Sequence, residues 1–174
     1  MKTVFRYLEA DYLKVGTGDS AKFEFMGSGY TALDESPGAE TDEKIYIHEK
    51  TSSSTVKSYK SKFPFTTELI QDEKTIMDIW SIARDHKTGV DAEREYAKVD
   101  LYDPVEGSKG TFKARLFKVS IEVTDKKGDG GEILELTGNL NAVGDPVLGS
   151  FNTKTLTFTP DATDTTTQTT NESV

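Results

Sequence analysis

The sequence predicts a mainly β protein, a β-sandwich with one flanking amphipathic α-helix and extended loops. Most apolar residues fall in short runs where they alternate with polar residues, and this period near two is typical of half-buried strands. Clusters of Gly, Pro and Asp separate the runs, as turns between strands require. The chain has 174 residues, which fits one domain with one core, and the number of runs favours a sandwich.

Strand-like alternation recurs along the chain. The segment 95–102 places its aliphatic residues on one face, whereas the longer segment 111–124 changes the parity of its apolar residues near Leu116. That change predicts a bulge or a crossing between layers. The segment 125–132, DKKGDGGE, predicts a hairpin turn because its glycines can adopt the positive φ of primed turns. Further strands are expected at 3–8, 21–26, 44–50, 55–65, 131–143 and 151–159.

One segment has a helical period instead. In residues 72–88 the apolar side chains recur three, four and seven positions apart, which predicts an amphipathic helix. Asp72 is the predicted N-cap, and Gly89 can adopt the left-handed conformation that ends a helix. We expect Trp80 to be the largest anchor of the helix on the sheet. The predicted core anchors are Ile76, Ile79, Trp80 and Ala83, with Ile82 widening the stripe.

Several polar stretches do not resemble packed core. Residues 27–43 carry five acids and are expected to form a surface loop. A hydroxyl-rich run between two strand patterns predicts a projecting hairpin tip, and it consists of Thr51, Ser52, Ser53 and Ser54. Residues 159–174 are rich in Thr and nearly free of large apolar groups, so they cannot offset the entropy of ordering. We therefore expect one domain over 1–158 and a flexible C-terminal tail over 159–174.

The charge balance is acidic. The chain has 21 Lys plus Arg against 30 Asp plus Glu, a formal net charge of -9, which argues against tight DNA or RNA binding through phosphate neutralisation. It has no cysteine, so disulfides, thiolate metal sites and cysteine nucleophiles are excluded. The N-terminal segment lacks the apolar run of a signal peptide or a membrane span. The expectation is a soluble chain made in a cytoplasm, without membrane contact.

No catalytic motif is complete. The sequence contains no GxSxG, HExxH or GxxxxGK[ST] pattern and no full GxGxxG after a strand. The two histidines, His48 and His86, fall in separate predicted elements, which favours structural roles over a zinc site. Glu40 and Asp42 could supply a carboxylate pair, but a loop is a poor support for glycosidase geometry. The sequence therefore predicts no enzyme, no cofactor and no metal ligands.

Four phrases in this order resemble the major tail tube proteins of long-tailed, siphovirus-type bacteriophages of Gram-positive bacteria. They are LDESPGAETDEKIYIHEKTSSSTVKSYKSKFPF (33–65), TTELIQDEKTIMDIW (66–80), TGVDAEREYAKVDLYDP (88–104) and GNLNAVGDPVLGSFNTKTLTFTP (138–160). The resemblance covers about residues 5–160. It lies in the combination and order of the phrases rather than in a single motif.

This resemblance implies a structural virion protein that self-assembles into hexameric rings, stacked into a hollow tail tube for DNA ejection into the host. Its partners would be further copies of itself and other tail proteins, namely the tape measure, tail terminator and distal tail proteins. DNA would pass through the lumen without specific binding. The protein would lie in the virion tail, and in the host cytoplasm during assembly.

The resemblance also suggests residue roles. The expected hairpin tip, Thr51 to Ser54, would contact the neighbouring ring. Candidate lumen residues come from the polar faces of the inner strands, and they are Lys98, Asp100, Glu122 and Glu135.

Two other function classes remain open from the sequence. A carbohydrate-binding β-sandwich module of a tail-tip or cell-surface protein could stack sugars on aromatic side chains, although aromatics at strand period are more often core. A hydrolase would use the loop carboxylates. Tube subunits should polymerise at high concentration, a sugar-binding module should stay small, and a hydrolase should show turnover.

Overall fold

The protein is mainly β with one α-helix, as the sequence predicts, in a computed structural model that describes residues 1–16, 18–48 and 50–162. These residues group into two compact units. The first comprises Met1–Ser28, Arg94–Lys118 and the chain from Pro146 onward; the second comprises Gly29–Glu93 and Val119–Asp145. Because each unit is built from separated segments, the chain passes between the units several times.

The strands of the first unit are β1 (Glu9–Val15), β2 (Lys22–Phe25), β7 (Glu93–Pro104), β10 (Val147–Asn152) and β11 (Thr157–Pro160). The second unit holds β3 (Tyr30–Leu33), β4 (Ala39–Lys44), β5 (Ser53–Tyr59), β6 (Lys62–Glu68), β9 (Glu135–Ala142) and the helix α1 (Lys74–Arg84). The long strand β8 (Thr111–Lys127) belongs to both. Short 3-10 turns occupy Arg6–Leu8, Gly18–Ser20 and Gly89–Ala92.

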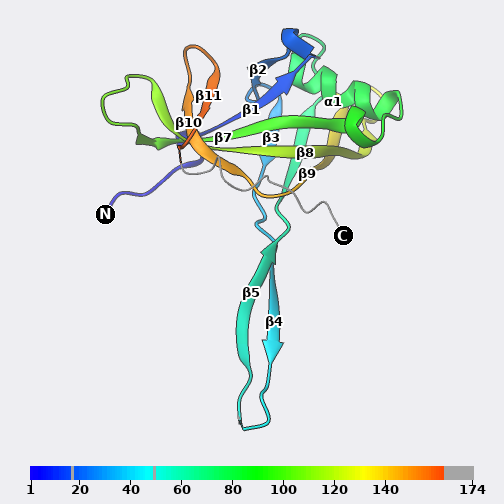
Figure 1. Cartoon of the computed structure of the whole chain (residues 1–174). Coiled ribbons are helices and arrows are strands. Elements are labelled where there is room, and N and C mark those ends of the chain that lie inside the picture. The colour runs from blue at the N-terminus through cyan, green and yellow to red at the C-terminus, as the bar shows by residue number, and fades with distance from the viewer. Residues whose placement is uncertain (17, 49, 163–174) are drawn as a thin grey trace, which may run out of the picture. The chain divides into compact units, whose positions relative to one another are not determined.

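Hydrogen bonds join nine of these strands into one sheet. Its order is β2-β1-β7-β8-β9-β6-β3, with β10 paired to β8 and β11 paired to β10. The remaining two strands, β4 and β5, form a separate two-stranded sheet (Figure 1).

An aromatic cluster forms the core of the first unit. The rings of Tyr12 and Phe151 stack with centroids 4.5 Å apart, and Phe23 meets Phe151 edge-on at 5.4 Å. Such pairs add to the free energy gained from apolar burial. The buried members of the cluster are Ala10, Tyr12, Phe23, Ala97, Val99, Ala114 and Phe151.

The core of the second unit follows the strand period. Strand β6 pairs with β3 on one side and β9 on the other, and its side chains alternate between buried and half-buried. Its Phe63 and Phe65 are buried, as are Leu136 and Leu140 of β9. The period of two in the sequence therefore corresponds to one face that leaves water on folding.

The helix α1 is shorter than the predicted span 72–88. Its N-cap is Glu73 rather than Asp72, and no side chain caps it. At the other end His86 takes a positive φ of 51°, while its N–H donates to the Ala83 carbonyl and the Lys87 N–H donates to the Ile82 carbonyl. These two bonds form a Schellman motif, which ends the helix before Gly89. Within the described residues, no helix is long and apolar enough to span a membrane.

The buried stripe of α1 is aliphatic. Ile76, Ile79 and Ile82 are buried, whereas Trp80 and Ala83 are only half-buried. The Lys126 ammonium lies 4.2 Å from the centroid of the Trp80 ring, a cation–π contact. The largest side chain of the helix therefore lies at the edge of its packed face, contrary to the expectation that it is the main anchor.

The parity change in 111–124 reflects a change of strand partner. Strand β8 pairs with β10 up to Leu116 and with β9 from Val119 onward. The register shift in the ladder lies farther along, between Val123 and Asp125. The sequence thus located the change of buried face, while the bulge itself has a different position.

The region before residue 60 differs most from the sequence expectation. The expected surface loop 27–43 contains β3 and most of β4, and among the described residues of the expected strand 44–50 only Lys44 belongs to a strand. The pattern missed β4 because its residues, AETDEK, contain no large apolar side chain. A strand without a buried face lacks the alternation on which the prediction depends.

Candidate assembly surfaces

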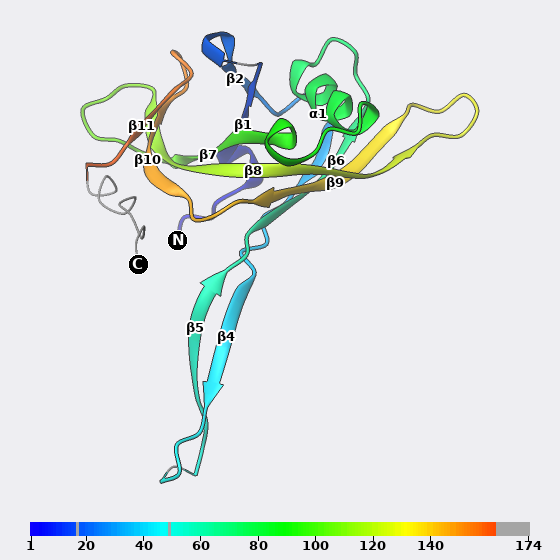
Figure 2. The same ribbon diagram turned by 45° about the vertical axis from the view of Figure 1, so that its right-hand side comes forward.

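The hairpin formed by β4 and β5 is a strand pair without a core. All residues of β5 are exposed, and in β4 only Asp42 is half-buried. The two strands run antiparallel from Ala39 opposite Tyr59 to Lys44 opposite Ser53, and the pair extends beyond β3 and β6 of the same unit (Figure 1, Figure 2). An isolated two-stranded hairpin is marginally stable in water. Its ordering therefore requires support from charged contacts or from a partner.

Exposed polar contacts hold the base of this hairpin. The Glu40 carboxylate lies 2.7 Å from the Lys60 ammonium, and the Ser58 hydroxyl donates to it at 3.1 Å. The hydrogen bonds from Lys60 and Ser58 lower the pKa of Glu40. Farther out, the Lys44 ammonium lies 3.5 Å from the Asp42 carboxylate. Ion pairs in water contribute little to stability, so these contacts set the register more than they stabilise the fold.

The end of the hairpin is apolar, in contrast to its strands. Ile45, Tyr46 and Ile47 follow β4 directly, and their exposed fractions are 68%, 55% and 108%. We call these three residues the tip run. The Tyr46 ring stacks with His48 at a centroid distance of 6.0 Å. Three consecutive exposed apolar residues are unfavourable on a soluble surface unless they serve a function, so the tip run is a candidate contact surface.

The predicted tip residues occupy the other side of the same turn. Thr51 and Ser52 precede β5, while Ser53 and Ser54 are its first residues, opposite Lys44 and Glu43. All four are exposed. The sequence analysis did not predict the tip run as a contact surface. It predicted a strand at 44–50, in which apolar side chains would be buried.

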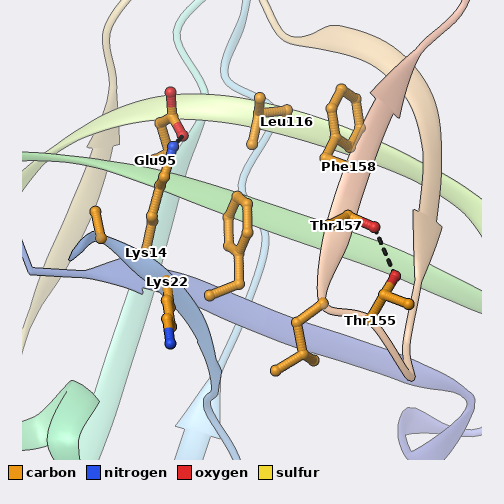
Figure 3. A pocket seen from close by; sticks show the side chains of 10 residues that line it. Lys14, Lys22, Glu95, Leu116, Thr155, Thr157 and Phe158 are labelled. Atoms are coloured by element: carbon orange, nitrogen blue, oxygen red, sulfur yellow. Dashed lines mark hydrogen bonds and ion pairs between the residues drawn. The ribbon is translucent and has the colours of Figure 1, made fainter. Parts of the chain in front are cut away.

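A second surface feature lies on the first unit, beside the turn between β10 and β11. It is a groove of about 530 Å3, which we call the β11 groove (Figure 3). Its lining residues are Lys14, Ala21, Lys22, Phe23, Glu95, Leu116, Thr155, Leu156, Thr157 and Phe158. Lys14 and Glu95 lie on one side and Thr155, Thr157 and Phe158 on the other (Figure 3). The groove thus combines apolar lining residues with a charged side.

The turn beside this groove is fixed by local hydrogen bonds. The Asn152 side chain accepts from the backbone N–H groups of Lys154 and Thr155, at 2.9 and 3.1 Å. Leu156 then takes a positive φ of 54°. That conformation is uncommon for a bulky residue. It leaves the Leu156 side chain lining the groove with 36% of its surface exposed.

A polar cluster lies between β1 and β7. The Lys98 side chain is 3% exposed, and its ammonium lies 3.1 Å from Glu9 and 3.6 Å from Asp11. The buried Asp11 also accepts a hydrogen bond from Tyr96 and pairs with Arg6. Lys98 is therefore buried within the subunit, which disagrees with its expected place on an accessible polar face. Its polar strand position is buried because the carboxylate of Asp11 stands opposite it across the strand pair.

The other three predicted lumen residues remain partly accessible. Asp100 is half-buried, its Oδ1 finds no hydrogen-bond partner within the described residues, and burial raises its pKa although the nearby Arg115 opposes this. Glu122 is exposed and accepts from Asn141 at 2.9 Å, and Glu135 is exposed at the start of β9. Asp100 lies in the first unit and the two glutamates in the second.

The carboxylates that the sequence offers for hydrolysis lie on the exposed hairpin. No group of three or more His, Cys, Asp or Glu side chains within the described residues could hold a metal ion. Glu40 and Asp42 pair with lysines on an exposed hairpin, and the pKa of Glu40 is lowered. A glycosidase acid needs the opposite shift, because it must remain protonated near neutral pH.

Comparisons with known proteins give fold similarity alone. No family model matches the chain, and no curated protein sequence matches it. A solved structure described as the tail of an empty GTA particle, computed with helical refinement and C6 symmetry, is similar with a TM-score of 0.52. The two sequences are 13% identical, and the similarity covers 79% of this chain and 93% of that one. At this identity the similarity establishes a shared fold.

A second structure, the 6-fold symmetrised baseplate of the anti-feeding prophage, covers 88% of this chain and 99% of that one. Its identity is 9% and its TM-score is 0.49. A score at that level supports no argument about function.

Proposed function

We propose that this chain is a structural subunit of a phage tail, of the kind that siphoviruses of Gram-positive bacteria carry. Its copies would form hexameric rings, and the rings would stack into a tube through which DNA leaves for the host. The fold shared with a chain of a C6-symmetric tail supports this proposal. The acidic net charge of -9 supports it as well, because an acidic lumen repels phosphate and leaves DNA free to slide.

The observation that carries the proposal is the exposed hairpin. Strands β4 and β5 have no core of their own, yet they end in three exposed apolar residues. Such an element favours a subunit that reaches a neighbour, because an exposed apolar run lowers solubility unless a partner covers it. Contact of Thr51 to Ser54 with the next ring belongs to this proposal, since those residues share the turn.

The remaining assignments follow from the same proposal. The partners would be further copies of the chain and the tape measure, tail terminator and distal tail proteins. The protein would lie in the virion tail after assembly in the host cytoplasm. Asp100, Glu122 and Glu135 are the candidate lumen residues of this proposal, whereas Lys98 is buried in the subunit. The tube domain would cover residues 1–158 and the tail 159–174, although Thr159 and Pro160 belong to β11 and residues 163–174 lie outside the described chain.

Negative-stain electron microscopy of concentrated purified protein tests the proposal. The unmodified chain should form hollow filaments of uniform width. A chain carrying Ile45→Ser and Ile47→Ser should keep its melting temperature and lose the filaments, because both side chains are already in water in the free subunit. Val90→Ser is the matched control, since Val90 is an apolar residue with 76% exposure outside the hairpin. Strictly monomeric unmodified protein at high concentration would contradict the proposal.

A further inference from the structure

We propose that the β11 groove of one copy receives the tip run, Ile45 to Ile47, of a second copy. This inference rests on the proposed function and names the surface that the hairpin would meet. It pairs two exposed apolar features of the described residues: a protruding run of three side chains and a groove with apolar lining residues.

The tip run is uncovered within the unit that holds it. Ile47 is fully exposed and Ile45 is 68% exposed, so no neighbouring strand of the second unit packs on them. Strand β5 has seven residues, which span about 23 Å at the usual rise of a strand. The hairpin can therefore hold its apolar end well away from the strands that lead into it. A groove that accepts two isoleucine side chains would remove them from water, with a gain that scales with the buried area.

The groove suits branched aliphatic side chains. Its apolar lining comes from Phe23, Leu116, Leu156 and Phe158. Leu156 is held in its unusual conformation by the turn after Asn152, with its N–H donating to the Asn152 carbonyl at 2.9 Å. Local backbone strain of this kind costs free energy and persists where the surroundings fix it. Its result here is an exposed leucine on the wall of the groove.

Charge selects the orientation of the contact. On the groove side, the exposed Lys22 makes no ion pair in the described part of the chain, whereas the Lys14 ammonium already lies 2.6 Å from Glu95. On the hairpin side, the exposed Glu43 precedes the tip run by two residues and likewise makes no ion pair among the described residues. A Glu43 carboxylate brought to Lys22 would satisfy both groups. Such complementary pairs contribute mainly to specificity and association rate.

Cysteine crosslinking tests the contact directly, because the chain contains no native cysteine. The full chain would carry Ile47→Cys and Leu156→Cys, be concentrated to form filaments, and be oxidised mildly. Non-reducing electrophoresis should then show a ladder of covalent oligomers. The matched control carries Ser58→Cys with Leu156→Cys, which places one thiol at the base of the hairpin, and it should form filaments without a ladder.

The outcomes separate this inference from the proposed function. Filaments of the Ile47 and Leu156 pair without a ladder would overturn the groove assignment and leave the tube function standing. A ladder from Phe5→Cys with Leu156→Cys in place of the hairpin pair would assign the groove to the exposed N-terminal segment and also overturn it. Absence of filaments from the unmodified chain would remove the proposed function and this inference together.

A charge exchange gives a second, independent test. Lys22→Glu and Glu43→Lys should each raise the concentration at which filaments appear by about tenfold, since each places like charges together. The double variant should return it to the unmodified value. Both residues are exposed, so the melting temperatures of the free subunits should agree. Single variants that assemble normally, or a double variant that stays impaired, would contradict the contact.

Discussion

Strands β5 and β6 are neighbours in the chain, separated by two residues, yet they differ in the number of strands they pair with and in the burial of their side chains. Both have seven residues. β6 lies between two other strands and buries Phe63, Phe65 and Thr67, whereas β5 pairs with one strand and buries none of its side chains. The difference shows that burial of one face stabilises β6, because β5 has the same extended backbone without that burial.

The consequence is a division of roles within the second unit. The strands around β6 can fold on the free energy of apolar burial. The hairpin β4 and β5 gains almost nothing from burial in the free subunit. Its exposed polar contacts set its register but add little stability, so in our proposal neighbouring copies complete its order.

The largest effect expected from this comparison is a core truncation in β6. Phe63→Ala should lower the free energy of unfolding by about 3–5 kcal/mol, because the side chain is fully buried. The matched change in β5, Val56→Ala, should remain within about 0.5 kcal/mol, since Val56 is 49% exposed. Urea titrations of both variants measure the two values. Equal losses would mean that the hairpin is packed in solution.

The helix allows a second test of burial against size. Ile79→Ala should cost about 2–5 kcal/mol because Ile79 is fully buried. Trp80→Ala should cost less, about 1–2 kcal/mol, because it removes a half-buried ring and its contact with Lys126. Thermal and urea unfolding give both numbers. If Trp80 proved the more costly loss, the ring would have to lie deeper than it does in this structure.

A smaller effect concerns Asp100 and pH. Burial raises its pKa, so its charged form is less favoured in the folded state than in the unfolded chain. The protein is therefore most stable, with respect to this group, below the unfolded pKa, where the carboxyl is neutral. That stability is lost as the pH rises through the folded pKa and the buried carboxylate becomes charged. Asp100→Asn should therefore raise the melting temperature at pH 7 and have a smaller effect near pH 3. A variant that melts lower than the unmodified chain at pH 7 would argue that Arg115 dominates instead.

The smallest effect on global stability is expected in the hairpin. Hydrogen bonds from Lys60 and Ser58 lower the pKa of Glu40. The contribution of these contacts to the stability of the hairpin is therefore present above the ordinary carboxyl pKa, and it is lost as the pH falls through the lowered pKa. Glu40→Gln should leave the melting temperature unchanged, because the ion pair lies in solvent. It should further accelerate the rapid amide exchange of β4 and β5 in the free subunit at neutral pH. Unchanged exchange there would show that the pair does not hold the hairpin.

The parts of the fold that sequence reasoning found are those with a buried face. The alternation in β6 to β9 and the aliphatic stripe of α1 are visible because every second or every third to fourth residue leaves water. The end of α1 was placed too late because the helix already ends before His86, which takes a left-handed conformation three residues before Gly89, although Gly89 has a positive φ as well. The sequence preference for glycine at that position is statistical, and local hydrogen bonds overrode it.

The candidate site was less predictable for the same reason. Strand β4 has no buried face, and the apolar tip run that follows it imitates a core strand in sequence. Lys98 was misplaced because a polar residue on a strand was taken as exposed, although Asp11 neutralises it across the strand pair. The β11 groove depends on Leu156 and on strands far apart in the chain, and no local pattern contains that information.

Hydrogen exchange of the free and assembled protein tests the central claim most directly, because it reports on both strands at once. We predict that the amides of β6 and β9 are protected in both states, whereas those of β4 and β5 exchange rapidly in the free subunit and become protected on assembly. Equal protection of β4 and β5 in the two states would contradict the claim that this hairpin is completed by a neighbouring copy.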